Sequence, residues 1–225
     1  MRGLAYRMAL LALAVTAVAL FAPACEEDDG DGGVAPTPTP GESPYMPLAV
    51  GNKWVYEVEH SKLNEPTTYG EYTLEVTGTI KDFGDGFPLA YVLTGTGDAD
   101  GPTERIVACW RDRLFVYVYR EDRMCLVLYN ALAEYSSSVE AGVFYLTDTE
   151  GYAGRADVDT PLGHFVNCIH NYGGYGSYNW SVEHDEYYVS GVGLVYAEDY
   201  AGEWGHYEPI SRTRNIYRLK AYELR

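Results

Sequence analysis

Apolar and polar residues alternate with a period of two in segment after segment between Lys53 and Leu224. In residues 53–59 the apolar positions are Trp54, Tyr56 and Val58, while Glu57 and Glu59 lie on the other parity. Successive side chains of a strand point to opposite faces, so this pattern predicts strands with one buried and one solvated face. The high content of Tyr (22), Gly (24) and Pro (11) also favours antiparallel strands and turns over helices.

The pattern predicts an all-β body over residues 45–225: a single antiparallel, strongly curved sheet, as an open barrel or a sandwich. Residues 130–140 are the only stretch that could form a short helix. In residues 71–80 we expect Tyr72, Leu74, Val76 and Ile80 to share the buried face. About ten strands are expected, from the segments 53–59, 71–80, 88–94, 105–110, 113–120, 123–129, 143–147, 164–170, 183–189, 192–199 and 212–224.

The first 24 residues have the features of a secretory signal. Arg2 and Arg7 precede an apolar run of 13 residues, which is too short to span a bilayer. Small residues precede Cys25, and this arrangement resembles the lipobox of bacterial lipoproteins. The resemblance implies cleavage before Cys25, a diacylglyceryl thioether on its sulfur and acylation (palmitate, for example) of the new amino group. The alternatives are an uncleaved anchor, and ordinary cleavage after Ala24 that leaves a free thiol.

Residues 25–44 are predicted to tether the body to the membrane. Acidic and glycine residues fill 26–33, and the proline-rich stretch 34–40 favours an extended polyproline conformation. Loss of Arg2 and Arg7 with the signal leaves 14 Lys and Arg against 33 Asp and Glu, a net charge of about −19. Because this charge repels phosphate backbones, we expect no nucleic-acid partner.

Three segments together resemble a broad group of uncharacterised bacterial lipoproteins. They are PLAVGNKWVY at 47–56, TPLGHF at 160–165 and YYVSGVGLV at 187–195. The resemblance implies an exported, β-rich envelope protein and transfers no catalytic residue. In the residues themselves, Gly51 and Asn52 indicate a turn with positive φ just before Trp54 enters the core.

Cysteine and histidine positions predict neither a metal site nor a cofactor. With Cys25 lipidated, Cys109, Cys125 and Cys168 remain. A meander separates Cys109 and Cys125 by one strand, so any disulfide should involve Cys168. His164, Cys168 and His170 share parity on one strand but lack a convincing fourth ligand, so we expect no metal. Ser181, His184 and Asp185 are too close along one strand to form a catalytic triad.

Aromatic side chains are the best candidates for ligand contacts. The first group lies on one face of a strand whose other face is also apolar, so it is either buried or displayed as an aromatic ladder. The second lies in a stretch rich in Tyr, Gly, Ser and Asn, which is typical of adaptable binding loops and of plain surface loops. The candidates are Phe115, Tyr117 and Tyr119, followed by Tyr172, Tyr175, Tyr178 and Trp180.

The last segment, 212–224, carries Arg212, Arg214, Arg218 and Lys220, with Arg225 just beyond it. Its expected hairpin partner carries Glu198 and Asp199, so cross-strand ion pairs are favoured over an anion site.

Together these features predict a lipid-anchored protein of the bacterial envelope, at the periplasmic face or the cell surface, with a binding or structural role and no catalytic residues. Its partners would be the membrane, through Cys25, and an apolar ligand, a glycan or another envelope protein. One alternative is a carrier that holds a lipid or other apolar ligand in a concave β cavity. The other is an envelope hydrolase whose carboxylates the sequence does not single out.

Overall fold

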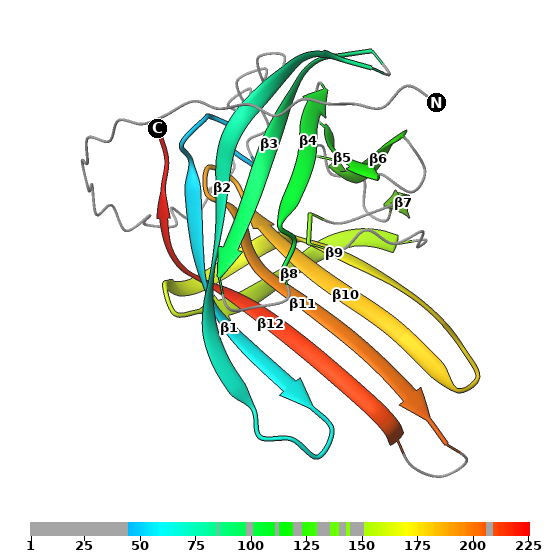
Figure 1. Ribbon diagram of the computed structural model, residues 1–225. Coiled ribbons are helices and arrows are strands. Elements are labelled where there is room, and N and C mark those ends of the chain that lie inside the picture. Colours follow the sequence, from blue (N-terminus) through cyan, green and yellow to red (C-terminus); the bar gives the residue numbers. More distant parts are fainter. Residues whose placement is uncertain are drawn as a thin grey trace. The chain divides into compact units, whose positions relative to one another are not determined.

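The computed structural model describes residues 45–84, 86–97, 101–110, 113–118, 123–129, 136–139, 143–144, 151–205 and 209–225 (Figure 1). All of them belong to one compact unit, Pro36–Arg225. The expected signal, Cys25 and the tether lie outside the described residues.

Within the described ranges the unit is all-β and contains no helix. Each strand is antiparallel to its sequence neighbour wherever the two pair. The strands are β1 (Lys53–Lys62), β2 (Thr68–Phe83), β3 (Phe87–Gly97), β4 (Glu104–Trp110), β5 (Arg113–Val118), β6 (Arg123–Tyr129), β7 (Ser136–Val139), β8 (Gly151–Thr160), β9 (Gly163–Ser177), β10 (Trp180–Val189), β11 (Gly193–Trp204) and β12 (Pro209–Glu223).

The twelve strands form one sheet in the order β6-β5-β4-β3-β2-β1-β12-β11-β10-β9-β8-β7. Two meanders, β1–β6 and β7–β12, therefore meet where the first strand pairs with the last. The sheet curls strongly, and hydrogen bonds therefore join segments that are far apart in this order. The Asn171 side chain on β9 donates to the Val127 carbonyl on β6 (3.0 Å), and Leu162 N donates to the Leu219 carbonyl on β12 (3.3 Å). The prediction of one curved, open antiparallel sheet is confirmed, with twelve strands instead of about ten.

The main core fills the inner side of this curl, which we call the core face. The predicted alternation is confirmed for Trp54, Tyr56 and Val58 on β1, all of which are buried. On β2, Tyr72, Leu74 and Val76 are buried as well, but Ile80 is not on that face. A bulge between Val76 and Gly78 reverses the parity and turns Ile80 toward a second cluster built around Phe87, Ala90 and Ile106.

Two of the three segments of the family resemblance contact each other in the core. Trp54 Nε1 donates a hydrogen bond to the Val192 carbonyl at 2.6 Å, and the Tyr56 hydroxyl donates to the Leu194 carbonyl at 2.9 Å. Gly193 has φ +108°, and a Cβ there would lie 2.9 Å from Trp54 Nε1, so no larger residue fits under the indole. Gly51 has φ +91°, as the predicted turn requires. The two segments therefore form one structural joint.

Some stretches differ from the strands that the sequence predicts. Residues 136–139, within the stretch that could have formed a short helix, form strand β7, and 151–160 form β8, which the pattern did not predict. Of the expected loop 172–180, residues 172–177 continue β9 and Trp180 begins β10. Of the expected strand 143–147, residues 143 and 144 are bends outside any strand, and 145–147 lie outside the described residues.

Candidate functional site

Residues 143–144 lie inside the curl, and we call them the interior dipeptide. Glu186 on β10 accepts hydrogen bonds from both of its backbone N–H groups, from Val143 N at 3.1 Å and from Phe144 N at 2.7 Å. On the other side, Arg105 on β4 donates to the Val143 carbonyl (3.1 Å) and to the Phe144 carbonyl (3.2 Å). A carboxylate and a guanidinium thus satisfy all four backbone groups of the dipeptide.

Glu186 is completely buried, and burial raises the pKa of its carboxyl group. Hydrogen bonds from Tyr188, Phe144 and Val143 and the charge of Arg105 oppose that rise. The Tyr188 hydroxyl donates to Glu186 at 2.6 Å, and burial together with this carboxylate raises the pKa of Tyr188 well above its ordinary value. The arrangement joins β4 and β10, which lie in different meanders, through the interior dipeptide.

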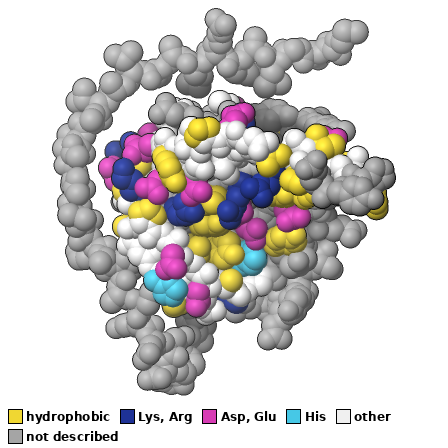
Figure 2. All heavy atoms as spheres, turned by 90° about the horizontal axis from the view of Figure 1, so that it is seen from below, with side chains coloured by type: hydrophobic (Ala, Val, Ile, Leu, Met, Phe, Trp, Pro, Cys, Tyr) yellow, Lys and Arg dark blue, Asp and Glu magenta, His cyan; other side chains and the backbone are white. Residues whose placement is uncertain are grey.

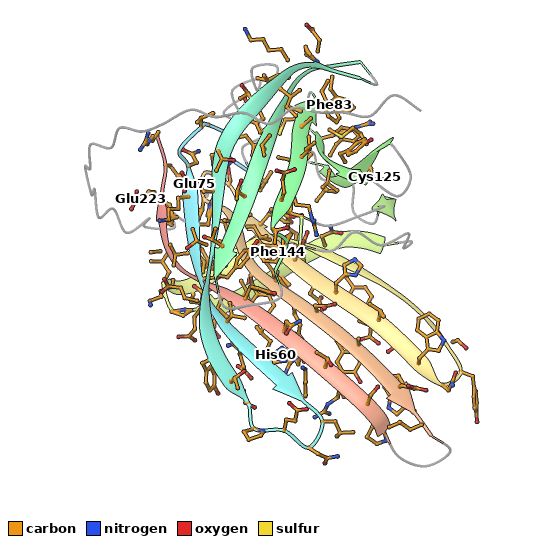
Figure 3. The ribbon with its side chains drawn as sticks, in the orientation of Figure 1. His60, Glu75, Phe83, Cys125, Phe144 and Glu223 are labelled. Atoms are coloured by element: carbon orange, nitrogen blue, oxygen red, sulfur yellow. The ribbon has the colours of Figure 1, made fainter. Side chains whose placement is uncertain are left out.

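Phe144 fills the space between the meanders (Figure 3). Its ring lies 5.6 Å from that of Tyr56, 5.5 Å from that of Tyr72 and 4.6 Å from that of Tyr217, measured between centroids. The Tyr72 hydroxyl donates to the Pro102 carbonyl at 2.5 Å. The interior around these residues is therefore packed with aromatic side chains of the protein itself.

The opposite side of β9–β12 and β1, which we call the outer face, is charged and aromatic. The strand register places Tyr172, Asp185, Glu198, Ile216 and Glu59 in one row across the five strands. The next row contains Gly174, Glu183, Tyr200, Arg214 and Ser61.

A recess opens on this face, and we call it the outer pocket. Its volume is about 340 Å³, and it is lined by Ser61, Glu183, Asp185, Glu198, Tyr200, Arg212 and Arg214. The lining comes from strands β1, β10, β11 and β12, so side chains far apart in the sequence meet at one place. The volume of the pocket is within the range of small-molecule sites, and its lining is polar and charged, which favours a polar ligand.

An ion pair holds one wall of the outer pocket. Arg214 donates from Nε to Glu198 Oε1 at 2.5 Å and from a terminal nitrogen to Oε2 at 3.0 Å, and the Tyr196 hydroxyl donates to Oε2 at 2.5 Å. Burial alone would raise the pKa of Glu198, but these hydrogen bonds and the charges of Arg214 and Arg218 outweigh it and lower the pKa. The same bonds raise the pKa of Arg214. Glu198 is thus ionised at neutral pH and neutralised by Arg214.

A second pair holds the neighbouring wall, because His170 on β9 hydrogen-bonds Asp185. The His170 ring stacks on Tyr187 at 4.3 Å, and Tyr187 meets Tyr196 edge-on at 5.2 Å. Burial, with the nearby charges of Asp185 and Glu198, raises the pKa of Tyr187 to about 12. These contacts therefore link the His170–Asp185 pair, through Tyr187 and Tyr196, to the Glu198–Arg214 pair.

Two charged lining residues differ from these pairs. Within the part of the chain that the structure describes, Glu183 and Arg212 have no ion-pair partner, and both are exposed. Tyr200 lies between them on β11, and its ring is 6.2 Å from that of Trp204. A Cβ at Gly202 would lie 2.6 Å from the Tyr200 hydroxyl, so a larger residue there would displace the Tyr200 side chain.

A polar row crosses the core face beyond the main core. The register aligns His184, Asp199, Asn215 and His60 on four adjacent strands, and His60 hydrogen-bonds Asn215. Burial lowers the pKa of His184 to about 4, with partial opposition from Asp185. Burial also raises the pKa of Asp199, which Asn215 opposes through a hydrogen bond. His184 is therefore neutral at physiological pH.

The expected charge pairing of the last strand is confirmed in part. Glu198 pairs with Arg214, as predicted, but Asp199 points to the other face. Arg218 pairs with Glu59 at 2.9 Å, and Lys220 pairs with Glu71 at 3.0 Å, so their partners come from β1 and β2.

The aromatic candidates do not come together in this pocket. Phe115 and Tyr117 are half-buried against the second cluster, where Phe115 lies 5.0 Å from Phe87 and Tyr117 lies 5.2 Å from Phe83. Of the two alternatives for this strand, burial on both faces is the better description, since Leu114 and Val116 are in the main core. Tyr119 lies outside the described residues.

The remaining candidates follow β9 and the hairpin after it. Tyr172 is half-buried, and its ring lies 6.4 Å from that of His170, next to the outer pocket but not in its lining. Tyr178 is 94% exposed in the turn, and Trp180 is 37% exposed at the start of β10. Tyr175 belongs to β9, and its side chain lies outside the described set.

The cysteine and histidine positions are now placed. Cys109, Cys125 and Cys168 are buried, and Cys125 pairs in register with Val116. A bulge between Phe165 and Cys168 puts Cys168 in the core, whereas His164 is exposed beside Asp159. In the described residues no three His, Cys, Asp or Glu side chains are grouped to hold a metal ion.

Charge and hydropathy are mixed over the surface. On the face that Figure 2 shows, basic, acidic and apolar side chains lie next to one another, and neither charge sign forms an unbroken patch. The described residues form no helix that could cross a membrane.

Comparisons with known proteins give no family. No protein-family model matches the chain, and no curated protein matches it in sequence. Three solved structures resemble it: a provisionally described exported protein with a YmcC-like fold from Bacteroides fragilis (12% identity, TM-score 0.47, 80% of this chain and 99% of that one), a provisionally described lipoprotein from Parabacteroides distasonis (11%, 0.46, 80% and 98%) and a LolA superfamily protein from Nitrosomonas europaea (7%, 0.25, 80% and 89%).

Proposed function

We propose that this chain is an exported envelope lipoprotein, anchored through acyl chains on Cys25, whose β unit binds a small polar ligand in the outer pocket and catalyses no reaction. The N-terminal signal and the cysteine after it support the anchor. The resemblance of the segments at 47–56, 160–165 and 187–195 to bacterial lipoproteins supports the same assignment.

The outer pocket is the observation that carries the binding role. Its walls are held by Arg214 with Glu198 and by His170 with Asp185, so a ligand would meet side chains that are already oriented. Preorganised charged groups lower the entropic cost of binding. We propose no catalytic role for the pocket, because its geometry does not distinguish one lining carboxylate as a general acid and another as a nucleophile.

The carrier alternative places an apolar ligand inside the curl. Phe144, Tyr56, Tyr72 and Tyr217 occupy that space and contact one another. A ligand there would have to displace the interior dipeptide from Glu186 and Arg105. The outer pocket requires no such displacement and is the better supported site.

Backbone amide NMR shifts of the mature protein in detergent micelles test the binding site. We expect polar probes (dipeptides, disaccharides and amino acids) to shift the amides of Glu183, Tyr200 and Arg212. Shifts caused by palmitate at Tyr56, Tyr72 and Phe144, with none at the outer pocket, would instead support the carrier.

Membrane fractionation tests the anchor separately. Wild-type protein is expected in the membrane fraction, and Cys25→Ala in the soluble fraction. A Cys25→Ala variant that still sediments with membranes would contradict the lipid anchor.

A further inference from the structure

We propose that the outer pocket recognises a zwitterion of dipeptide size, with Arg212 binding its carboxylate and Glu183 its ammonium group. This inference rests on the proposed function, because it names the ligand class of the same pocket. It starts from the charges that the pocket leaves without a partner.

The pocket contains two cationic and three anionic side chains, and most of them satisfy one another. Arg214 forms two hydrogen bonds with Glu198, and Asp185 bonds His170. Glu183 and Arg212 are the lining charges that have no ion-pair partner among the described residues. One cation and one anion are therefore available to a ligand, which favours a molecule that carries both signs.

The strand register sets the spacing of these two charges. Glu183 on β10 lies opposite Tyr200 on β11, and Arg212 on β12 lies opposite Gly202, two residues further along β11. Two strand spacings and the two-residue offset together separate the Cα atoms of Glu183 and Arg212 by about 12 Å, and both side chains are long enough to lean over β11. An extended dipeptide holds its terminal charges about 7 Å apart, whereas a single amino acid carries both on one Cα. The dipeptide matches the spacing better.

A neutral group of the pocket fits the middle of such a ligand. Tyr200 lies on β11 between the two charges, and its hydroxyl group both donates and accepts hydrogen bonds, as a peptide N–H and C=O require. In the interior, by contrast, Glu186 accepts from the N–H groups of residues 143–144 and Arg105 donates to their carbonyls, so the groups bound there are uncharged backbone groups.

Isothermal titration of the mature protein in detergent with L-alanyl-L-alanine tests the inference. Two capped probes remove one charge each, N-acetyl-alanyl-alanine the ammonium and alanyl-alanine amide the carboxylate. We expect each cap to weaken binding at least tenfold. N,N′-diacetylchitobiose, which carries no charge, represents the glycan class and should not bind.

Variants assign the two ends. Glu183→Gln should weaken the binding of alanyl-alanine at least tenfold and leave the binding of the N-acetylated probe unchanged. Arg212→Gln should also weaken the binding of alanyl-alanine at least tenfold, and it should leave the binding of the amidated probe unchanged. Glu203→Gln and Lys220→Gln lie on β11 and β12 outside the pocket and serve as matched controls that should change nothing. All four positions are exposed, so folding should be unaffected.

The outcomes separate this inference from the proposed function. Capped and uncapped dipeptides of equal affinity, or chitobiose as the tighter ligand, would overturn the zwitterion while the pocket remains a binding site. Absence of any amide shift at the pocket with all polar probes would overturn both.

Discussion

The interior of the sheet and its outer face each bring a carboxylate close to a guanidinium, and they use this chemistry differently. In the interior, Glu186 and Arg105 act on residues 143–144 of the same chain, and Glu186 has no exposed surface. On the outer face, Arg214 binds Glu198 directly, with 44% and 19% of their side chains exposed.

The difference shows what each pair contributes. A buried carboxylate that accepts three hydrogen bonds cannot lose them without leaving buried donors unsatisfied, so the interior pair stabilises the fold. A pair partly in water contributes little to stability, but it can orient a surface that a ligand reaches. Four measurements test this contrast, starting with the largest expected effect.

Glu186→Ala should break the interior site. The substitution leaves the N–H groups of Val143 and Phe144 and the Tyr188 hydroxyl without an acceptor, so the free energy of unfolding should fall by about 3–5 kcal/mol. Urea denaturation followed by tryptophan fluorescence measures it. Glu183→Ala on the exposed side of the same strand is the control, with an expected change below about 0.5 kcal/mol. Equal effects of the two substitutions would contradict the contrast.

His184 should make stability fall in mild acid. Its folded-state pKa of about 4 lies below its ordinary value of 6.5, so the unfolded chain binds the proton first as the pH drops. Above pH 6.5 the titration of His184 does not change the free energy of unfolding. Below pH 6.5 it lowers the free energy of unfolding progressively, by about 3 kcal/mol at pH 4.

A His184→Gln variant, which cannot titrate, tests this pH dependence. The difference in unfolding free energy between wild type and variant should change between pH 7.5 and pH 4.5, and the contribution of Glu186 cancels because both proteins contain it. A difference that stays constant over this range would show that His184 has the same pKa in the folded protein as in the unfolded chain, and would contradict the lowered value.

Trp54→Phe should weaken the joint between β1 and the turn before β11. The indole N–H bonds the buried Val192 carbonyl, and phenylalanine keeps an aromatic ring but no donor. We expect a loss of about 1–2 kcal/mol in chemical denaturation. Tyr222→Phe, a half-buried residue on the neighbouring strand, is a control that should lose less. A loss no larger than that of the control would mean that this hydrogen bond contributes little.

The Arg214–Glu198 pair should give the smallest effect. A double-mutant cycle with Arg214→Gln and Glu198→Gln should give a coupling of about 0.5–1 kcal/mol, reduced in 1 M salt because exposed charges are screened. The lowered pKa of Glu198 means that this contribution is present above its ordinary pKa and is lost as the pH falls through the folded-state value. A coupling above about 2 kcal/mol, insensitive to salt, would place this pair in the same class as the interior site.

Much of the fold could be predicted from alternation alone. Trp54, Tyr56 and Val58 lie on one parity with charged residues between them, and the chain follows that pattern because burial of one sheet face dominates. The pattern failed where a bulge reverses parity, as at Ile80, since one extra residue in a strand leaves no mark in composition. Strand β8 was missed because Gly151, Gly154 and Asp159 are poor strand formers that pairing with β9 nevertheless holds extended.

The sites were predicted less well. Glu186 has the same parity as Tyr188, so its burial was visible in principle, but a glutamate in a run of charged residues is ordinarily assigned to the solvated face. The outer pocket combines side chains from β1, β10, β11 and β12, and their meeting depends on the pairing of the first strand with the last. No local pattern encodes that pairing.

The pairing of β1 with β12 at the middle of the sheet also bears on how such a chain matures. In a polypeptide that crosses a membrane from its amino end, β1 to β6 emerge early, and every strand pairing within that half is between sequence neighbours. The two halves pair as strands of one sheet only when Pro209–Glu223 arrives, close to the carboxyl end. Translocation would thus be nearly over before the sheet is continuous. The complete twelve-stranded sheet therefore cannot form, and cannot obstruct passage of the chain, until almost all of it has crossed.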